Sequence, residues 1–542
     1  MSLSVIVPEL ILIITACGLM LLGASSRLAA RKAAPVLALL ALLVVFGTQV
    51  THLYDEGIAQ TDTAGALRVT NLTTYINVLA SGIGALLVLL AWPSDPEATG
   101  NSALKFGNDA GEFFALLLLS ISGIFLVAAA NDLILLFLGI ELASFPTYIM
   151  VSISRPLPVA QEAGVKYFFL GAMAAALMLF GFSYLYGTTG QIDLTRLAAY
   201  FAGTTSSIAA PTVLSTWQTL AVVMLIAGFA FKMAAFPLHF YAGDVYEGSA
   251  TPVTALLSFV PKTSGFVALI KLLFVITGGQ WHAPDAIVTL LWFLAAITMT
   301  VGNVLGLTQQ NVKRTLAYSS VAHSGYMLAG LAVTLGGISP ERAQGVLFYL
   351  AAYGIVNIAA FGVLMLLPSR TSGLPATSAE TFEDLAGTGR THPGFGLAMA
   401  VACFSLIGLP LTVGFFGKLY LILPALNGEN ATPWNVWLVI IMLINAAISA
   451  GYYLRIVGVM FLRGEPQIFS DEPATPIQTP PRAPALLLAV TISAVATLLF
   501  GAIFPATQLL QTAVAAPALV DSPPDRSATA SSQLPQPEQQ QP

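Results

Sequence analysis

The segments GFAFK (residues 228–232) and GFFGK (residues 414–418) each end on a lysine that lies inside a long apolar stretch. They belong to the seventh and twelfth apolar stretches, and because these are five helices apart, the two copies would face opposite ways across a bilayer. Pro237 follows the first lysine and Pro410 precedes the second, so both helices are expected to be broken there. The pattern predicts an all-α membrane protein with two inverted repeats.

The composition is typical of a polytopic membrane protein. Of the 542 residues, 56% are hydrophobic and 9% are charged, whereas soluble domains carry about 25% charged residues. The net charge of −5 is small and gives no support to nucleic-acid binding. The two cysteines and five histidines show no metal-ligand spacing, and no nucleotide-binding glycine motif occurs. We therefore expect no metal and no cofactor in this chain, so that any redox energy must arrive from partner subunits.

Hydropathy predicts about 14 spanning helices, because a span needs about 20 apolar residues. They cover residues 3–23, 34–54, 71–92, 111–130, 132–153, 160–186, 216–240, 250–277, 285–306, 314–336, 342–367, 393–424, 433–462 and 483–505. We divide the chain into an N-terminal part of three spanning helices (1–110), a first five-helix repeat (111–280), a second, inverted five-helix repeat (281–465), a last helix with the loop before it (466–505), and a Pro/Gln-rich tail (506–542). The composition of the tail predicts disorder.

Lysine and arginine residues predict the orientation of the bundle. If the N-terminus lies outside, the inner loops and their flanks hold 11 of these residues and the outer side holds 4. Positive charge gathers on the inner side of membrane proteins. Both chain termini are therefore predicted to lie on the outer side.

Four ionisable residues lie deep within predicted spans: Glu141, Lys232, Lys262 and Lys418. Each charge at the bilayer centre costs about 2.5–3.5 kcal/mol on insertion scales, and such residues commonly mark ion or proton paths. A carboxylate that moves towards or away from a buried lysine would switch that lysine between holding and releasing a proton. The alternatives are static pairing and snorkelling, and for Lys271, which lies nearer a helix end, snorkelling is an equal possibility.

Three further residues are weaker candidates for the same path. Lys166 lies near the inner start of its helix, His239 follows the break at Pro237, and His323 lies well inside the tenth span. A histidine can relay protons near neutral pH, but a neutral imidazole hydrogen-bonded to a neighbouring helix is the simpler interpretation. For Lys166 a purely structural role is the alternative. Asp244 and Glu247 are expected in an inner loop, as a solvated face or as the mouth of a proton inlet.

Many segments of the chain also occur in one known family. They are residues 130–133, 137–142, 166–172, 186–190, 231–232, 237–239, 244–248, 251–254, 313–314, 317–320, 323–326, 406–410 and 414–418. Through them the chain resembles the antiporter-like membrane subunits of proton-translocating NADH–quinone oxidoreductase, respiratory complex I, and among these subunit N. The resemblance covers residues 110–465, and the chain ends match only in hydropathy.

This resemblance implies 14 helices, two inverted five-helix repeats and broken seventh and twelfth helices. It implies that Glu141 modulates Lys232, that Lys262 connects laterally, and that Lys418 exchanges protons with the outside. It further implies a bacterial plasma membrane and an enzyme complex in which partner subunits hold NAD, FMN, iron–sulfur clusters and quinone. The partners would include neighbouring antiporter-like subunits and peripheral subunits, and this chain would carry no redox centre.

Two other functions remain open from the sequence. The first is a subunit of a multisubunit cation/proton antiporter without redox chemistry, because the glutamate and lysine segments are shared across the superfamily. The second is a passive membrane scaffold. The four buried charges argue against a scaffold, since such a protein would gain stability if leucine replaced them.

Overall fold

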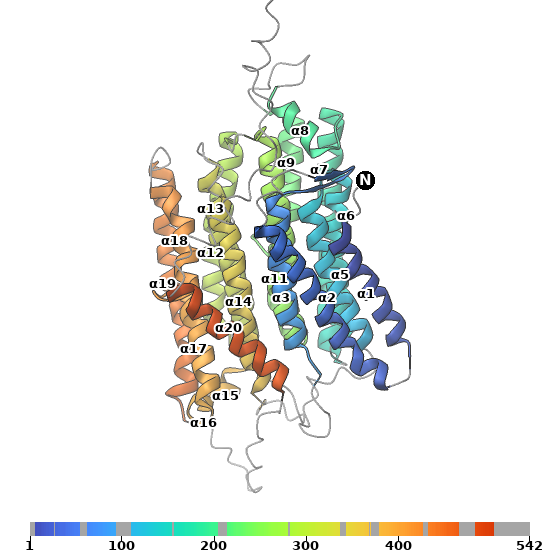
Figure 1. The fold of residues 1–542 in the computed structure, drawn as a ribbon. Helices are drawn as coiled ribbons and strands as arrows, with labels where there is room; N and C mark the ends of the chain where they lie inside the picture. Colours follow the sequence, from blue (N-terminus) through green and yellow to red (C-terminus); the bar gives the residue numbers. More distant parts are fainter. Residues whose placement is uncertain are drawn as a thin grey trace, which may run out of the picture.

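The computed structural model shows helices that run side by side in one bundle (Figure 1). The residues that it describes are 6–25, 28–54, 62–93, 110–153, 155, 157–203, 214–279, 282–335, 343–367, 369, 379–426, 432–464 and 483–502. The predicted Pro/Gln-rich tail and most of the loop before the last helix lie outside these ranges.

Ten of the described helices are long and apolar enough to cross a membrane. They are α2 (Leu28–Tyr54), α3 (Asn71–Leu90), α5 (Ala110–Ala129), α6 (Leu133–Ile153), α7 (Pro158–Thr189), α11 (Thr251–Ile276), α12 (Asp285–Thr308), α14 (Gln344–Leu366), α19 (Pro433–Phe461) and α20 (Pro484–Ala502). The prediction of a mainly helical membrane protein is confirmed at this level.

The remaining described helices are shorter or more polar. Those of at least 14 residues are α1 (Val7–Gly23), α9 (Thr216–Lys232), α13 (Val312–Thr334), α17 (Pro393–Ile407) and α18 (Val413–Leu426). Four short helices connect them: α8 (Leu194–Phe201), α10 (Tyr241–Gly248), α15 (Phe382–Leu385) and α16 (Thr388–Thr391). Hydropathy did not predict the short helices, because each is too brief to produce an apolar window.

A small β-hairpin is the one departure from an all-α fold among the described residues. Strands β1 (Asp62–Ala64) and β2 (Leu67–Val69) pair antiparallel, with Thr63 opposite Arg68. Leu67 also forms an isolated bridge with Ala130, just after α5. The hairpin therefore closes over the end of α5 and brings Arg68 to that end of the bundle.

Helix α11 lies at the centre of the described bundle. All 26 of its residues are buried, and it packs against α5, α6, α9 and α14. A helix that is covered on every side belongs to the interior of a large or membrane-embedded protein. Its two lysines, Lys262 and Lys271, are therefore surrounded by protein and not by lipid.

Helix α13 packs closely against α12, and Gly325 permits this approach. A Cβ atom at Gly325 would lie 2.5 Å from the backbone nitrogen of Met299, so that any other residue would force the helices apart. Small residues commonly allow such close contacts between membrane helices. The contact fixes the position of α13, whose buried side chains include His323 and Ser324.

The two helices that were predicted to be broken are both interrupted, between α9 and α10 and between α17 and α18. Among the described residues, the two non-glycine residues with positive φ are Ala234 (55°) and Leu411 (72°), and each lies in one of these breaks. Side chains disfavour this backbone conformation, and such strain is concentrated at functional positions. Lys232 is the last residue before its break, whereas Lys418 follows the other break. Lys232 and Lys418 therefore lie on opposite sides of their helix breaks along the chain, although the two sequence segments are similar.

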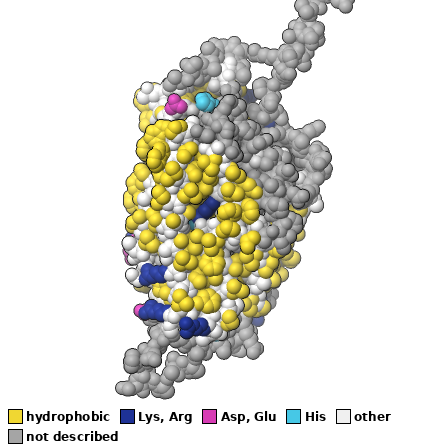
Figure 2. All heavy atoms as spheres, turned by 90° about the vertical axis from the view of Figure 1, so that its left-hand side faces the viewer, with side chains coloured by type: hydrophobic (Ala, Val, Ile, Leu, Met, Phe, Trp, Pro, Cys, Tyr) yellow, Lys and Arg dark blue, Asp and Glu magenta, His cyan; other side chains and the backbone are white. Residues whose placement is uncertain are grey.

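The outer surface of the bundle suits a lipid environment. Figure 2 shows one face on which hydrophobic side chains cover the middle, while lysine and arginine side chains gather towards the lower end. On α19, for example, Trp434, Leu443 and Ile444 are all more than half exposed. Apolar side chains in this number would be costly in water and are expected where a helix faces lipid.

Candidate functional site

Glu141 and Lys232 form an ion pair inside the bundle. Nζ of Lys232 donates a hydrogen bond to Oε1 of Glu141 at 2.9 Å. The Lys232 side chain is completely buried, whereas 23% of the Glu141 side chain is exposed. The sequence suggested this pair without showing that its members meet, and the structure brings them together.

Tyr148 also binds Lys232, and the sequence did not predict this contact. Its hydroxyl oxygen accepts a second hydrogen bond from Nζ of Lys232 at 3.1 Å. Gly171 of α7 makes room for this hydroxyl, because a Cβ at Gly171 would lie 2.3 Å from it. Tyr148 follows Glu141 by seven residues, about two helical turns, so the two share one face of α6. That spacing is the signal that could have identified it.

Lys262 of α11 is bound by α13. Its Nζ donates to the backbone oxygen of Ser320 and, at 2.9 Å, to Oγ of Ser324. The same nitrogen lies 5.2 Å from the ring centroid of Tyr353, a cation–π distance. Within the described part of the chain, Lys262 takes part in no salt bridge. Neutral oxygens and an aromatic face are therefore the partners that the structure provides for its ammonium group.

His323 lies between two tyrosine hydroxyl groups. Nδ1 is 2.6 Å from the Tyr349 hydroxyl and Nε2 is 3.0 Å from the Tyr453 hydroxyl. The Tyr453 hydroxyl also forms a hydrogen bond with Ser319. A neutral imidazole has one donor and one acceptor nitrogen, so one tyrosine accepts a hydrogen bond while the other donates one. If the two tyrosines exchanged these donor and acceptor roles, a proton would in effect pass from one side of the imidazole ring to the other.

Lys418 lies in the second turn of α18, and its side chain reaches back to the break between α17 and α18. Its Nζ donates to the backbone oxygens of Leu406 (2.9 Å) and Ile407 (2.7 Å), which are the last carbonyls of α17. A helix carboxyl end carries a partial negative charge that favours a cation. Nζ also lies 4.8 Å from the ring centroid of Tyr326. Because Tyr326 belongs to α13, this helix supplies partners to both Lys262 and Lys418.

Lys166 belongs to a different, more exposed network. Its Nζ pairs with Glu162 and with Asp244, each at 2.8 Å. Arg314 pairs with Asp244 at 2.9 Å and with Glu247 at 2.7 Å. Each oxygen of the Asp244 carboxylate thus accepts a hydrogen bond from a cation, one from Lys166 and the other from Arg314. The acidic residues expected in a loop thus lie on α10 and are paired.

His239 lies in the break between α9 and α10. Its ring contacts those of Phe236 and Phe240, with centroids 5.8 and 5.0 Å away. Its Nδ1 is buried and has no hydrogen-bond partner among the described residues. The structure therefore places His239 beside the broken helix, in an aromatic setting, and not within the Glu141–Lys232 pair.

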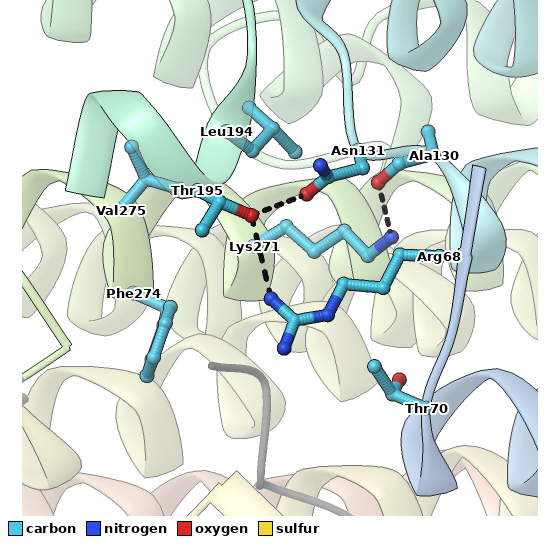
Figure 3. A pocket seen from close by; sticks show the side chains of 9 residues that line it. All are labelled: Arg68, Thr70, Ala130, Asn131, Leu194, Thr195, Lys271, Phe274 and Val275. Carbon is cyan, nitrogen blue, oxygen red and sulfur yellow. Dashed lines mark hydrogen bonds between the residues drawn. The ribbon is translucent and has the colours of Figure 1, made fainter. Parts of the chain in front are cut away.

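Lys271 does not snorkel. Its side chain is buried, and its Nζ donates to the backbone oxygens of Ala128 and, at 2.8 Å, of Ala130 (Figure 3). These carbonyls lie at the end of α5. Figure 3 shows Arg68 beside Lys271, with a hydrogen bond to Thr195. These residues line a cavity of about 30 Å³, which can hold one or two water molecules. Lys271 therefore stabilises the carboxyl end of α5.

We expect the substitution Lys271→Met to destabilise the subunit without reducing proton translocation. It removes the lysine donor from two carbonyls; Ala128 keeps Thr73 as a donor, but the carbonyl of Ala130 loses its lysine partner, and an unsatisfied buried polar group costs about 1–3 kcal/mol. A lower thermal transition of the purified complex, with unchanged protons translocated per NADH oxidised, would agree with this. Normal stability combined with lost translocation would instead assign Lys271 to the proton path.

Comparisons with known proteins identify related sequences and structures. The sequence model of the family described as NADH:quinone oxidoreductase/Mrp antiporter, TM matches residues 130–449. A protein named NADH-quinone oxidoreductase subunit N 1 from Sorangium cellulosum is 38% identical over 432 residues, which are 79% of this chain and 78% of that protein.

Two solved structures show the same fold. A chain of respiratory complex I from Thermus thermophilus with bound aureothin is 29% identical, with a TM-score of 0.72 over 94% of this chain and 100% of that one. A chain of the Mrp complex from Dietzia sp. is 19% identical, with a TM-score of 0.75 over 94% of this chain and 97% of that one. At that identity the second likeness concerns the fold alone.

Proposed function

The chain belongs to the family of NADH-quinone oxidoreductase subunit N, and we propose that it translocates protons through a relay of buried lysine and glutamate side chains. The matching family model covers oxidoreductase and antiporter subunits alike, but the 38% identical relative is named subunit N, whereas the solved chain of the Mrp complex is 19% identical. The relatives therefore favour this function over that of a cation/proton antiporter without redox chemistry. The observation that carries the relay is the buried contact between Lys232 and Glu141, next to a break in α9.

The proposed relay has four stations, in the order Glu141 with Lys232, then Lys262, then Lys418. Helix α13 supports this order because it contacts Lys262 through Ser324 and Lys418 through Tyr326. His323, on the same helix between two hydroxyl groups, is suited to pass a proton between the two lysines. We place Lys166 outside the line, at the inner surface, and His239 beside the α9 break.

We propose 14 membrane passes arranged in two inverted five-helix repeats, residues 111–280 and 281–465. To the ten long helices we add α1, α13, α9 continued by α10, and α17 continued by α18. The two helix breaks, each with one strained non-glycine residue, support the repeat.

We propose that the chain lies in the plasma membrane of a bacterium with both termini outside. The relative from Sorangium cellulosum is bacterial. The end of the bundle that holds Lys166 and Arg314 would face the cytoplasm, in keeping with the preference of basic residues for that side.

We further propose that NAD, FMN, iron–sulfur clusters and quinone act in partner subunits, which include neighbouring antiporter-like subunits. The solved chain from Thermus thermophilus comes from respiratory complex I, which supports assembly with such partners. This chain would contribute the membrane path for protons and no redox step of its own.

Purification of the tagged chain from native membranes tests the assignment to an NADH-oxidising complex. We expect it to carry along subunits that contain flavin and iron–sulfur clusters, detectable by absorption and by electron paramagnetic resonance. Recovery with small membrane subunits alone, after extraction in a mild detergent, would favour the antiporter.

A further inference from the structure

The carbonyl of Met233, at the end of α9, has lost its usual helical partner. Within a helix this oxygen would accept a hydrogen bond from the N–H group four residues ahead, but that residue is Pro237, which has no N–H. Oγ of Ser324 donates to it instead, at 2.6 Å. A serine of α13 therefore replaces the missing backbone donor at the break that follows Lys232.

The same serine is also a partner of Lys262. Nζ of Lys262 donates to Oγ of Ser324 at 2.9 Å. An ammonium group has three donors and no acceptor, so the single hydroxyl proton of Ser324 must point elsewhere. Its acceptors are the oxygen of Met233 and, at a longer 3.3 Å, the oxygen of Ser320 on its own helix.

We propose that Ser324 couples the protonation state of Lys262 to the helix break that carries Lys232. When Lys262 is an ammonium group, Ser324 accepts from it and donates to Met233. When Lys262 becomes a neutral amine, its nitrogen has a lone pair and can accept the hydroxyl proton, which leaves the Met233 carbonyl without a donor. Ser324 is thus a positioning residue, and this inference rests on the proposed relay.

Loss of the hydrogen bond from Ser324 to the Met233 carbonyl would affect the neighbouring residue Lys232. Met233 is the next residue, and Ala234 already has a strained positive φ. Gly265 of α11 also lies against this end of α9, since a Cβ there would be 3.2 Å from Cβ of Lys232. A buried carbonyl without a partner favours rearrangement of the backbone. Proton release at Lys262 would therefore loosen the break and move Lys232 relative to Glu141.

Among the described residues, Lys262 is the titratable group whose hydrogen bond reaches Ser324. Tyr353 of α14 presents its ring to Nζ, and Tyr246 of α10 reaches Ser320 at 3.3 Å. His323 of α13 is directed towards Tyr349 and Tyr453. Lys232 of α9 is occupied by Glu141 and Tyr148.

Amide hydrogen exchange of the α9–α10 break in the assembled complex tests the coupling. After correction for intrinsic rates, we expect exchange in residues 233–240 of the unmodified complex to rise several-fold with pH as Lys262 loses its proton. Lys262→Met should keep the break protected at every pH, because Ser324 then always donates to Met233. Ser324→Ala should leave it exposed at every pH, and Ser324→Thr, which keeps the hydroxyl, should restore the pH dependence.

Ser258→Ala is the matched control, since Ser258 is a buried serine of α11 that donates to Ala255 of its own helix. It should leave exchange and proton translocation unchanged, whereas Ser324→Ala should lower protons translocated per NADH several-fold. Exchange that still varies with pH in Lys262→Met overturns the coupling, even if Ser324→Ala fails to assemble. Full translocation in Lys262→Met would instead overturn the relay itself, so the two failures are distinguishable.

Discussion

The substitution Lys262→Met is expected to lower redox-driven proton translocation about tenfold or more while the complex still assembles. Methionine is close to lysine in length and fills the same buried space without a charge to desolvate. The variant lacks the amino group of Lys262, which can carry a proton and which contacts Ser324 and Tyr353. The loss should therefore be one of function and not of folding.

Proteoliposomes that contain the purified complex provide the measurement, as protons taken up per NADH oxidised. Lys271→Met is the matched control, because it makes the same change at a buried lysine on the same helix. It should lower stability and leave this ratio intact. Equal losses of translocation in the two variants, or no loss in Lys262→Met, would contradict the assignment of Lys262.

Hydropathy predicted most membrane helices to within a few residues. The span 250–277 corresponds to α11 (Thr251–Ile276), and 342–367 to α14 (Gln344–Leu366). Both helices are long and have a high mean hydropathy, so the signal is strong despite the two lysines of α11. The breaks were also predictable, since proline and glycine interrupt both helices near a lysine.

Pairing between helices was much harder to predict. Nothing in the spacing of Glu141 and Lys232, which are 91 residues apart, says that α6 and α9 place them in contact. Asp244 and Glu247 were expected in a loop because an eight-residue polar helix such as α10 gives no hydropathy signal. Hydroxyl partners such as Ser324 were missed for a related reason, since serine is common in membrane helices and only tertiary packing distinguishes this one.

The substitution Glu141→Gln is expected to lower proton translocation about tenfold or more, through the loss of a charge and not of a hydrogen bond. A glutamine keeps an oxygen that can accept from Lys232. At 2.9 Å and an effective dielectric constant of 20, however, the full charges attract each other by about 6 kcal/mol, an attraction that desolvation of the pair opposes and that the neutral amide lacks. Glu141→Ala is a harsher change, because among the described side chains Lys232 then keeps Tyr148 as its hydrogen-bond partner.

Glu162→Gln provides the matched control for this charge removal. Glu162 also accepts from a lysine, Lys166, at 2.8 Å, but 63% of its side chain is exposed, and surface pairs contribute little. Translocation should survive that change. The double variant Glu141→Gln with Lys232→Met should be no worse than the poorer single variant, because both act on one contact. Losses that multiply in the double variant would show that the two residues act separately, and the proposed switch between them would then be wrong.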